Sequence, residues 1–168
     1  MAGLVNGAGA SPPGSPADGY ECARAWSALT AAHTRITAQL SAALDRECGL
    51  TIHDFEILLR VDAAGPAGLR LGELSAVVPL TQPALSRAVA RLAARGWVSR
   101  AGVPDDRRGI IIASCAAGQA VLRRAIGVHA ATIGELLLDR LSPDEQELLA
   151  RVLSRVAAGP SAEQSAGG

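Results

Sequence analysis

The side chains best suited to chemistry lie in an arginine-rich stretch, residues 81–109. Six arginines outnumber two aspartates there, at positions Arg87, Arg91, Arg95, Arg100, Arg107 and Arg108 against Asp105 and Asp106. Guanidinium groups bind phosphates and guanine edges, and amide or hydroxyl side chains pair with other bases. Although the whole chain has no formal net charge, this local excess predicts a surface for double-stranded DNA.

A helix is expected to present these side chains. Leu85, Val89 and Leu92 are spaced by four and three residues, which places them on one buried stripe. Thr81 can cap the start of this helix, and Pro83 is tolerated in its first turn. The residues that then project away from the core are Gln82, Ala84, Ser86, Arg87, Arg91 and Arg95. We expect that face to read bases.

Short strands should follow this helix. Gly96 supplies a stop, residues 97–100 alternate in polarity, and Ile110, Ile111 and Ile112 form a β-branched run. The segment 101–109 between them is too long for a two-residue turn and should protrude as a wing. Before the helix, Leu74 and Val77 form the buried side of a shorter helix that ends at Pro79, and residues 69–71 could supply a third strand. The pattern predicts a winged helix-turn-helix.

The stretch LSAVVPLTQPALSRAVARLAARGWVSR, followed by PDDRRG, resembles the MarR family of bacterial transcriptional regulators over residues 50 to about 122. The resemblance implies that Gln82, Ala84, Ser86 and Arg87 contact bases, that Arg107 reaches the minor groove, and that Asp106 with Arg108 shapes the wing. Thr81 and Arg91 complete our set of candidate DNA contacts. Ser114 and Cys115 stand where many relatives carry Leu-Thr, which puts the cap of the next helix in question.

The N-terminal part of the chain divides at glycines and prolines. Residues 1–19 are dominated by Gly, Ala, Ser and Pro and are expected to be disordered. A long amphipathic helix from Glu21 to near Gly49 should follow, with its apolar stripe at Cys22, Trp26, Leu29, Ile36, Leu40 and Leu44. A capping box of Thr51 with Asp54 and a staple of Leu50 with Phe55 then start a helix through about Asp62. That helix is expected to bury Phe55, Leu58 and Leu59.

The C-terminal part should be helical as well. Residues 116 to about 140 carry an apolar stripe, and Ser142 with Glu145 forms a second capping box. The last helix is expected to bury Leu148, Leu149, Val152, Leu153 and Val156, and residues 159–168 to form a polar tail. We therefore predict a mainly α protein with a small antiparallel β wing, in which a DNA-binding domain at 50–115 is joined to a dimerisation region at 20–48 and 116–158.

Excess apolar surface on the long helices predicts a homodimer that binds a pseudo-palindromic site, and the family resemblance implies the same. It also implies a repressor that is released by a small aromatic or phenolic ligand. Matching ligand positions are Arg24, Trp26, His53 and Asp54, although a role of Trp26 in the dimer core is equally compatible with the sequence. Alternatives are an oxidation sensor that uses Cys22, or a dimeric interaction module without DNA binding.

Other classes of protein fit the sequence poorly. His33, His53 and His129 lie in separate helical stretches without a nucleophile motif, so no enzyme is predicted. The three cysteines lack paired spacing, and His53, Asp54 and Glu56 are expected on different helix faces, so we predict no metal site and no cofactor. Without an apolar segment of membrane-spanning length or a secretory signal, a cytoplasmic location is expected.

Overall fold

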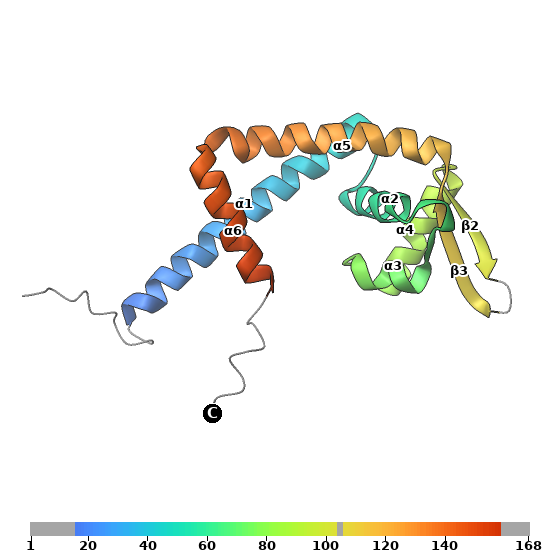
Figure 1. The fold of residues 1–168 in the computed structure, drawn as a ribbon, viewed down its shortest axis with the longest axis horizontal. Helices are drawn as coiled ribbons and strands as arrows, with labels where there is room; N and C mark the ends of the chain where they lie inside the picture. Colours follow the sequence, from blue (N-terminus) through green and yellow to red (C-terminus); the bar gives the residue numbers. More distant parts are fainter. Residues whose placement is uncertain (1–15, 104–105, 159–168) are drawn as a thin grey trace, which may run out of the picture. The chain divides into compact units, whose positions relative to one another are not determined.

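The computed structural model describes residues 16–103 and 106–158, with side chains for residues 19–102 and 109–158. Its elements are α1 (Pro16–Cys48), α2 (Ile52–Ala63), β1 (Leu69–Arg70), α3 (Leu71–Val77), α4 (Gln82–Ala94), β2 (Val98–Val103), β3 (Asp106–Ser114), α5 (Ala116–Leu136) and α6 (Pro143–Ala158), with short 3-10 turns at Gly65–Ala67 and Leu138–Arg140 (Figure 1). The predicted fold class, a mainly helical protein with a small antiparallel wing, is confirmed.

The chain divides into two compact units after Thr37. In the first unit, the described residues are the N-terminal part of α1. Because α1 begins at Pro16, residues 16–19 are helical and not part of a disordered tail as predicted; residues 1–15 and 159–168 lie outside the described residues. Within the described ranges, none of the helices has an apolar stretch long enough to cross a membrane.

The core of the second unit is built from the last turns of α1, from α2, α3 and α4, from the sheet, and from the first half of α5. Gly49 ends α1 in a left-handed conformation (φ 63°), with its N–H donating to the Asp45 carbonyl at 2.8 Å. The predicted capping box then starts α2: Asp54 N–H donates to Thr51 Oγ1 at 3.1 Å, and Thr51 N–H donates to Asp54 Oδ2 at 3.2 Å. Leu50 and Phe55, the predicted staple, are both buried in this core.

The sheet has the order β1-β3-β2 with antiparallel pairs, so the predicted third strand is present. The wing differs from the prediction. Pairing continues from Val98↔Ser114 to Gly102↔Ile110 and resumes, after an irregularity, at Val103↔Asp106. The two strands thus extend into the segment expected to be a loop, and the described part of the wing is a two-stranded ribbon (Figure 1).

Several apolar side chains expected in the core are exposed. Val77 is 51% exposed, and Val78 takes its place because the chain leaves α3 in an extended conformation that turns Val78 inward. Leu59 on α2, also expected in the core, is 39% exposed, and Ile126 in the apolar stripe of α5 is 44% exposed. On α6 no residue is buried, although five were expected to be, and Leu148, Leu153 and Val156 are exposed. No element in the described part of the chain covers this stripe.

Candidate nucleic-acid interface

The helix α4 separates a buried face from an exposed face, as its spacing predicts. Leu85, Val89 and Leu92 are buried in the core, together with Ala88. Thr81, Gln82, Ser86 and Arg87 are exposed at the N-terminal end of the helix, and Ala84 is half-buried beside them. The predicted base-reading residues therefore occupy one solvent-facing surface over the first two turns.

The start of α4 also suits an anion. Thr81 occupies the N-cap position, but its side chain makes no capping hydrogen bond, contrary to our expectation. The first turn contains no acidic residue. Free N–H groups and the positive end of the helix dipole are thus available to a phosphate at this point.

The β2–β3 ribbon carries the remaining candidate contacts. Arg100 on β2 is exposed. Asp106, Arg107 and Arg108 belong to the backbone of β3, but their side chains lie outside the described part of the structure. Their assigned roles at the tip of the wing remain predictions.

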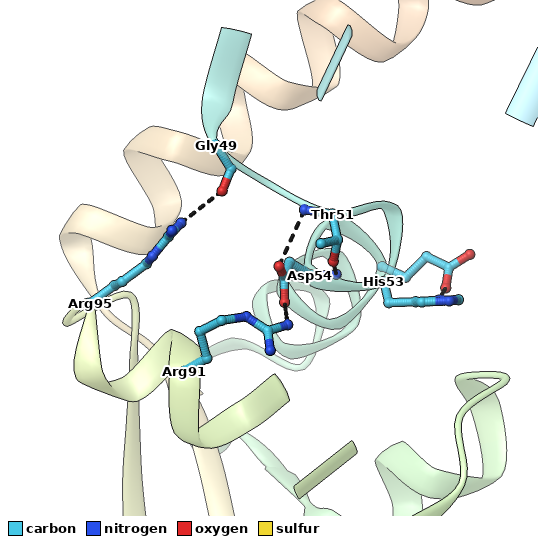
Figure 2. Close-up of polar contacts among 7 residues, drawn as sticks. Gly49, Thr51, His53, Asp54, Arg91 and Arg95 are labelled. Carbon is cyan, nitrogen blue, oxygen red and sulfur yellow. Dashed lines mark hydrogen bonds and ion pairs between the residues drawn. The ribbon is translucent and has the colours of Figure 1, made fainter. Parts of the chain in front are cut away.

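Two arginines at the C-terminal end of α4, Arg91 in its last turn and Arg95 at its C-cap, contact other parts of the protein (Figure 2). Arg91 Nη2 lies 2.6 Å from Asp54 Oδ1, in an ion pair whose carboxylate is only 3% exposed. Arg95 Nη1 donates to the Gly49 carbonyl at 2.7 Å, and its guanidinium carbon lies 4.7 Å from the centre of the Trp97 ring. Both contacts join α4 to the junction between α1 and α2.

These contacts reduce the free positive charge that the sequence suggests. The charge of Arg91 is balanced by Asp54. Among the described arginines of residues 81–102, Arg87 and Arg100 are exposed and have no ion pair. Within this segment, the free positive charge on described side chains therefore lies at Arg87 on α4 and at Arg100 on β2.

The candidate ligand residues lie in different surroundings. Trp26 on α1 is 69% exposed, and Arg24 is exposed near it in sequence. On α2, His53 Nδ1 lies 3.3 Å from Glu56 Oε2. Asp54 has both carboxylate oxygens engaged, one by Arg91 and one by the Thr51 N–H. Asp54 is therefore buried and engaged in contacts within the fold.

Cysteine and metal chemistry have little support in the described residues. Cys22 is exposed on α1 and Cys115 is half-buried. Burial raises the pKa of the Cys48 thiol, and the nearby Arg124 only partly opposes this. A raised pKa disfavours the reactive thiolate. The described side chains contain no cluster of histidine, cysteine and carboxylate groups that could hold a metal ion.

Sequence reasoning identified Arg91 as exposed and Asp54 as a capping residue but did not pair them. The two residues are 37 positions apart. One signal was available in the sequence. Asp54 is the third residue of a helix whose neighbouring residues are apolar, and a carboxylate that is buried with them needs a cation as its partner. Only the packing of α4 against α2 shows which cation supplies it.

Comparison with known proteins places these features in a common context. A sequence model of the MarR family matches residues 49–109. The chain is 28% identical to the multiple antibiotic resistance protein MarR of Escherichia coli strain K12 over 107 residues, which cover 64% of this chain and 73% of that protein.

Solved structures agree with this match. Sco3205, a MarR family transcriptional regulator from Streptomyces coelicolor solved in complex with DNA, has a TM-score of 0.71 and 33% identity, covering 83% of this chain and 91% of that chain. AbsC, another MarR family regulator from the same organism, has a TM-score of 0.68 and 26% identity, covering 80% of this chain and 90% of that chain.

Proposed function

Because the chain belongs to the MarR family of DNA-binding transcriptional regulators, we propose that it acts in the cytoplasm as a homodimeric repressor. It binds a pseudo-palindromic operator and is released by a small molecule. The observation that carries this proposal is the exposed N-terminal half of α4, where Gln82, Ser86 and Arg87 share one surface next to an uncapped helix start. A helix of this kind enters the major groove with its first turns.

The contacts divide by chemistry. Gln82 and Arg87 can form paired hydrogen bonds with adenine and guanine, and Ser86 can bond to several bases. Ala84 offers an apolar contact, and the Thr81 hydroxyl, free of a capping bond, can reach a phosphate. From the ribbon, Arg107 is assigned to the minor groove, with Asp106 and Arg108 shaping the tip.

Dimerisation follows from uncovered apolar surface on the segments 20–48 and 116–158. Leu148, Leu153 and Val156 form an exposed stripe on α6, and Trp26 and Leu29 form another on α1. A monomer would leave both stripes in water, at a cost of about 25 cal/mol for each Å² of apolar area. A second copy would cover them and, by two-fold symmetry, would repeat α4 about one DNA turn away.

The effector is proposed to be an aromatic acid. Trp26 offers a ring face and Arg24 a cation on the exposed surface of α1. Calorimetric titration with a series of phenolic acids, repeated on Trp26→Ala, tests this role. Binding that disappears in the variant while the dimer persists supports an effector site, whereas a variant that becomes monomeric assigns Trp26 to the dimer core.

Two alternative functions can also be tested with variants and binding measurements. An oxidation sensor would use Cys22, which is exposed, and peroxide would then weaken operator binding in the wild type but not in Cys22→Ser. A dimeric interaction module would bind no DNA. The unpaired Arg87 favours DNA binding over this module, because a surface that no longer binds DNA does not require a cation without a neighbouring negative charge.

The decisive experiment is selection of duplexes from a random pool by the full chain, followed by sequencing. We expect an inverted repeat whose half-sites are separated by about one helical turn. Enrichment of a single, asymmetric half-site would contradict the homodimer, and absence of any enriched sequence together with salt-independent binding would contradict the function as a whole.

A further inference from the structure

Arg91 in the last turn of α4 and Arg95 at its C-cap are spaced by four residues and therefore lie one turn apart on the same side. Arg91 contacts the N-terminal turn of α2, and Arg95 contacts the residue that ends α1 (Figure 2). Both contacts lie within the second compact unit. The C-terminal end of α4 is thereby joined to the α1–α2 junction at two points, at Gly49 and in the first turn of α2.

The contact of Arg91 satisfies a buried charge. Asp54 is 3% exposed, and the Thr51 N–H bonds only one of its two oxygens. Without Arg91 the second oxygen would be a desolvated charge with no partner, which is strongly unfavourable. The Arg91 side chain is itself 46% exposed, so the guanidinium group reaches inward from the surface and is held there.

The contact of Arg95 satisfies a carbonyl at a helix end. Gly49 follows the last residue of α1, and its carbonyl accepts a hydrogen bond from Arg95. The aromatic ring of Trp97 supports the same guanidinium group. This arrangement fixes the direction in which the Arg95 side chain leaves α4.

We propose that Arg91 and Arg95 are positioning residues, which set the orientation of α4 against the α1–α2 junction and do not bind DNA. The proposal rests on the proposed function of α4 as the base-reading helix. In this arrangement a displacement of the last turn of α1 is passed directly to α4, because Gly49 follows the last residue of α1 and Asp54 lies in the first turn of α2. The junction therefore couples the position of α1 to the register of Gln82 and Arg87 on DNA.

The direction in which one substitution changes DNA affinity distinguishes a positioning role of Arg91 from phosphate binding. Asp54→Asn removes a negative charge near the DNA-binding helix and frees Arg91. If Arg91 were a phosphate ligand, both changes would tighten binding to every duplex. If Arg91 positions α4, Asp54→Asn weakens operator binding despite the more favourable charge, because the helix loses one of its two attachments.

Binding is measured by fluorescence anisotropy with the full-length dimer, on the selected operator and on a random duplex, at several salt concentrations. For Asp54→Asn we expect operator affinity to fall about tenfold, with random-duplex affinity within about twofold of wild type and an unchanged salt slope. Tighter binding to both duplexes would overturn the proposal. Wild-type protein that fails to discriminate the two duplexes would instead overturn the proposed function.

Two controls address folding. Thr51→Ala removes the capping bond to the Asp54 N–H but leaves the Asp54–Arg91 pair intact, so it should lower the melting temperature without changing the ratio of operator to random-duplex affinity. Arg91→Lys keeps the charge at an exposed position but loses the planar guanidinium group. If Arg91→Lys lowers the ratio of operator to random-duplex affinity, positioning is supported. If the ratio stays at the wild-type value, charge alone suffices and the proposal is refuted.

A double-mutant cycle tests whether the two residues act through one another. We expect Arg91→Met to cost little operator affinity when Asp54→Asn is already present, because the attachment is then already lost. Additive losses, or a salt slope reduced by about one in Arg91→Met alone, would show an independent DNA contact and overturn the assignment.

Discussion

Gly118 in the first turn of α5 lies directly against the main-chain carbonyl of Trp97, so that a β-carbon at residue 118 would come within 2.0 Å of the Trp97 oxygen. The same oxygen accepts a hydrogen bond from the Cys115 N–H at 3.0 Å. The start of α5 is thus fixed against the residue that precedes β2. This close approach connects the wing sheet to the long C-terminal helix.

Gly118→Ala should therefore destabilise the protein by about 1–3 kcal/mol, because backbone atoms must move to admit the methyl group. Urea unfolding monitored by circular dichroism measures the change. Gly127→Ala on the same helix is the matched control: a β-carbon there meets nothing within 4 Å, and the better helix propensity of alanine should stabilise the protein by up to about 1 kcal/mol. Equal effects of the two substitutions would contradict the packing argument.

Cys115 gives a prediction of the opposite sign. It occupies the N-cap of α5 with extended backbone angles, but its side chain makes no capping bond, as its departure from the family's usual residues suggested. Cys115→Ser supplies an oxygen that can accept a hydrogen bond from a free N–H group of the first turn, and the substitution should stabilise the protein by about 1 kcal/mol. Thermal melting checks this. Cys115→Ala removes the thiol without adding a cap, so an equal gain in that variant would refute the explanation.

The local features of the fold could be predicted from the sequence because their determinants are a few residues apart. Both capping boxes are present as expected, Thr51 with Asp54 and Ser142 with Glu145. The buried stripe of α4 could also be predicted, because a helix of thirteen residues shows several turns of periodicity. At the end of α3, with only seven residues, the pattern was too short to distinguish Val77 from Val78.

Features that depend on contacts between distant parts of the chain, or on a second molecule, could not be predicted in this way. The pair of Asp54 and Arg91 depends on how α2 packs against α4, and neither residue has a local pattern that specifies the other. The stripe on α6 reads as core in the sequence, yet Leu153 and Val156 are exposed in one chain. Periodicity identifies an apolar face but not the molecule that covers it.

Glu145 should give a measurable pH dependence. The Ser142 N–H and then the Ser142 hydroxyl donate to its carboxylate and lower the pKa of Glu145 below its ordinary value. The capping contribution to stability is therefore complete above the ordinary pKa of glutamate and disappears as the pH falls through the lower pKa of the folded state. Carbon-detected NMR titration of Glu145 measures this pKa.

Ser142→Ala is the informative variant for Glu145. It removes the hydroxyl but keeps the main-chain N–H, so we expect the pKa of Glu145 to rise only part of the way to its ordinary value. Return of the pKa to the fully ordinary value would assign the effect to the hydroxyl alone and contradict the larger role of the main-chain donor.

We expect α4 and the wing to contribute differently to DNA binding. Arg107→Ala should weaken binding to all duplexes and reduce the salt slope by about one, because a minor-groove or phosphate contact carries little sequence information. Gln82→Ala and Arg87→Ala should also change the preferred sequence, at a cost of about 1–3 kcal/mol for each lost paired contact. Repeating the selection with each variant distinguishes these outcomes. Equal losses on every sequence for all three variants would refute the assignment.

The exposed stripe of α6 leads to the last prediction. Val156 is 69% exposed, and a second copy of the chain is proposed to cover it. Val156→Glu would then place a charge in an apolar interface, where a desolvated carboxylate without a partner is strongly unfavourable. We expect the variant to be monomeric at micromolar concentration by light scattering and to lose affinity for the full operator more than for a single half-site. Ser154→Glu adds the same charge to an exposed residue on the opposite side of α6 and should remain dimeric. If both variants stay dimeric, α6 does not form the interface, and the dimer must be built from another surface.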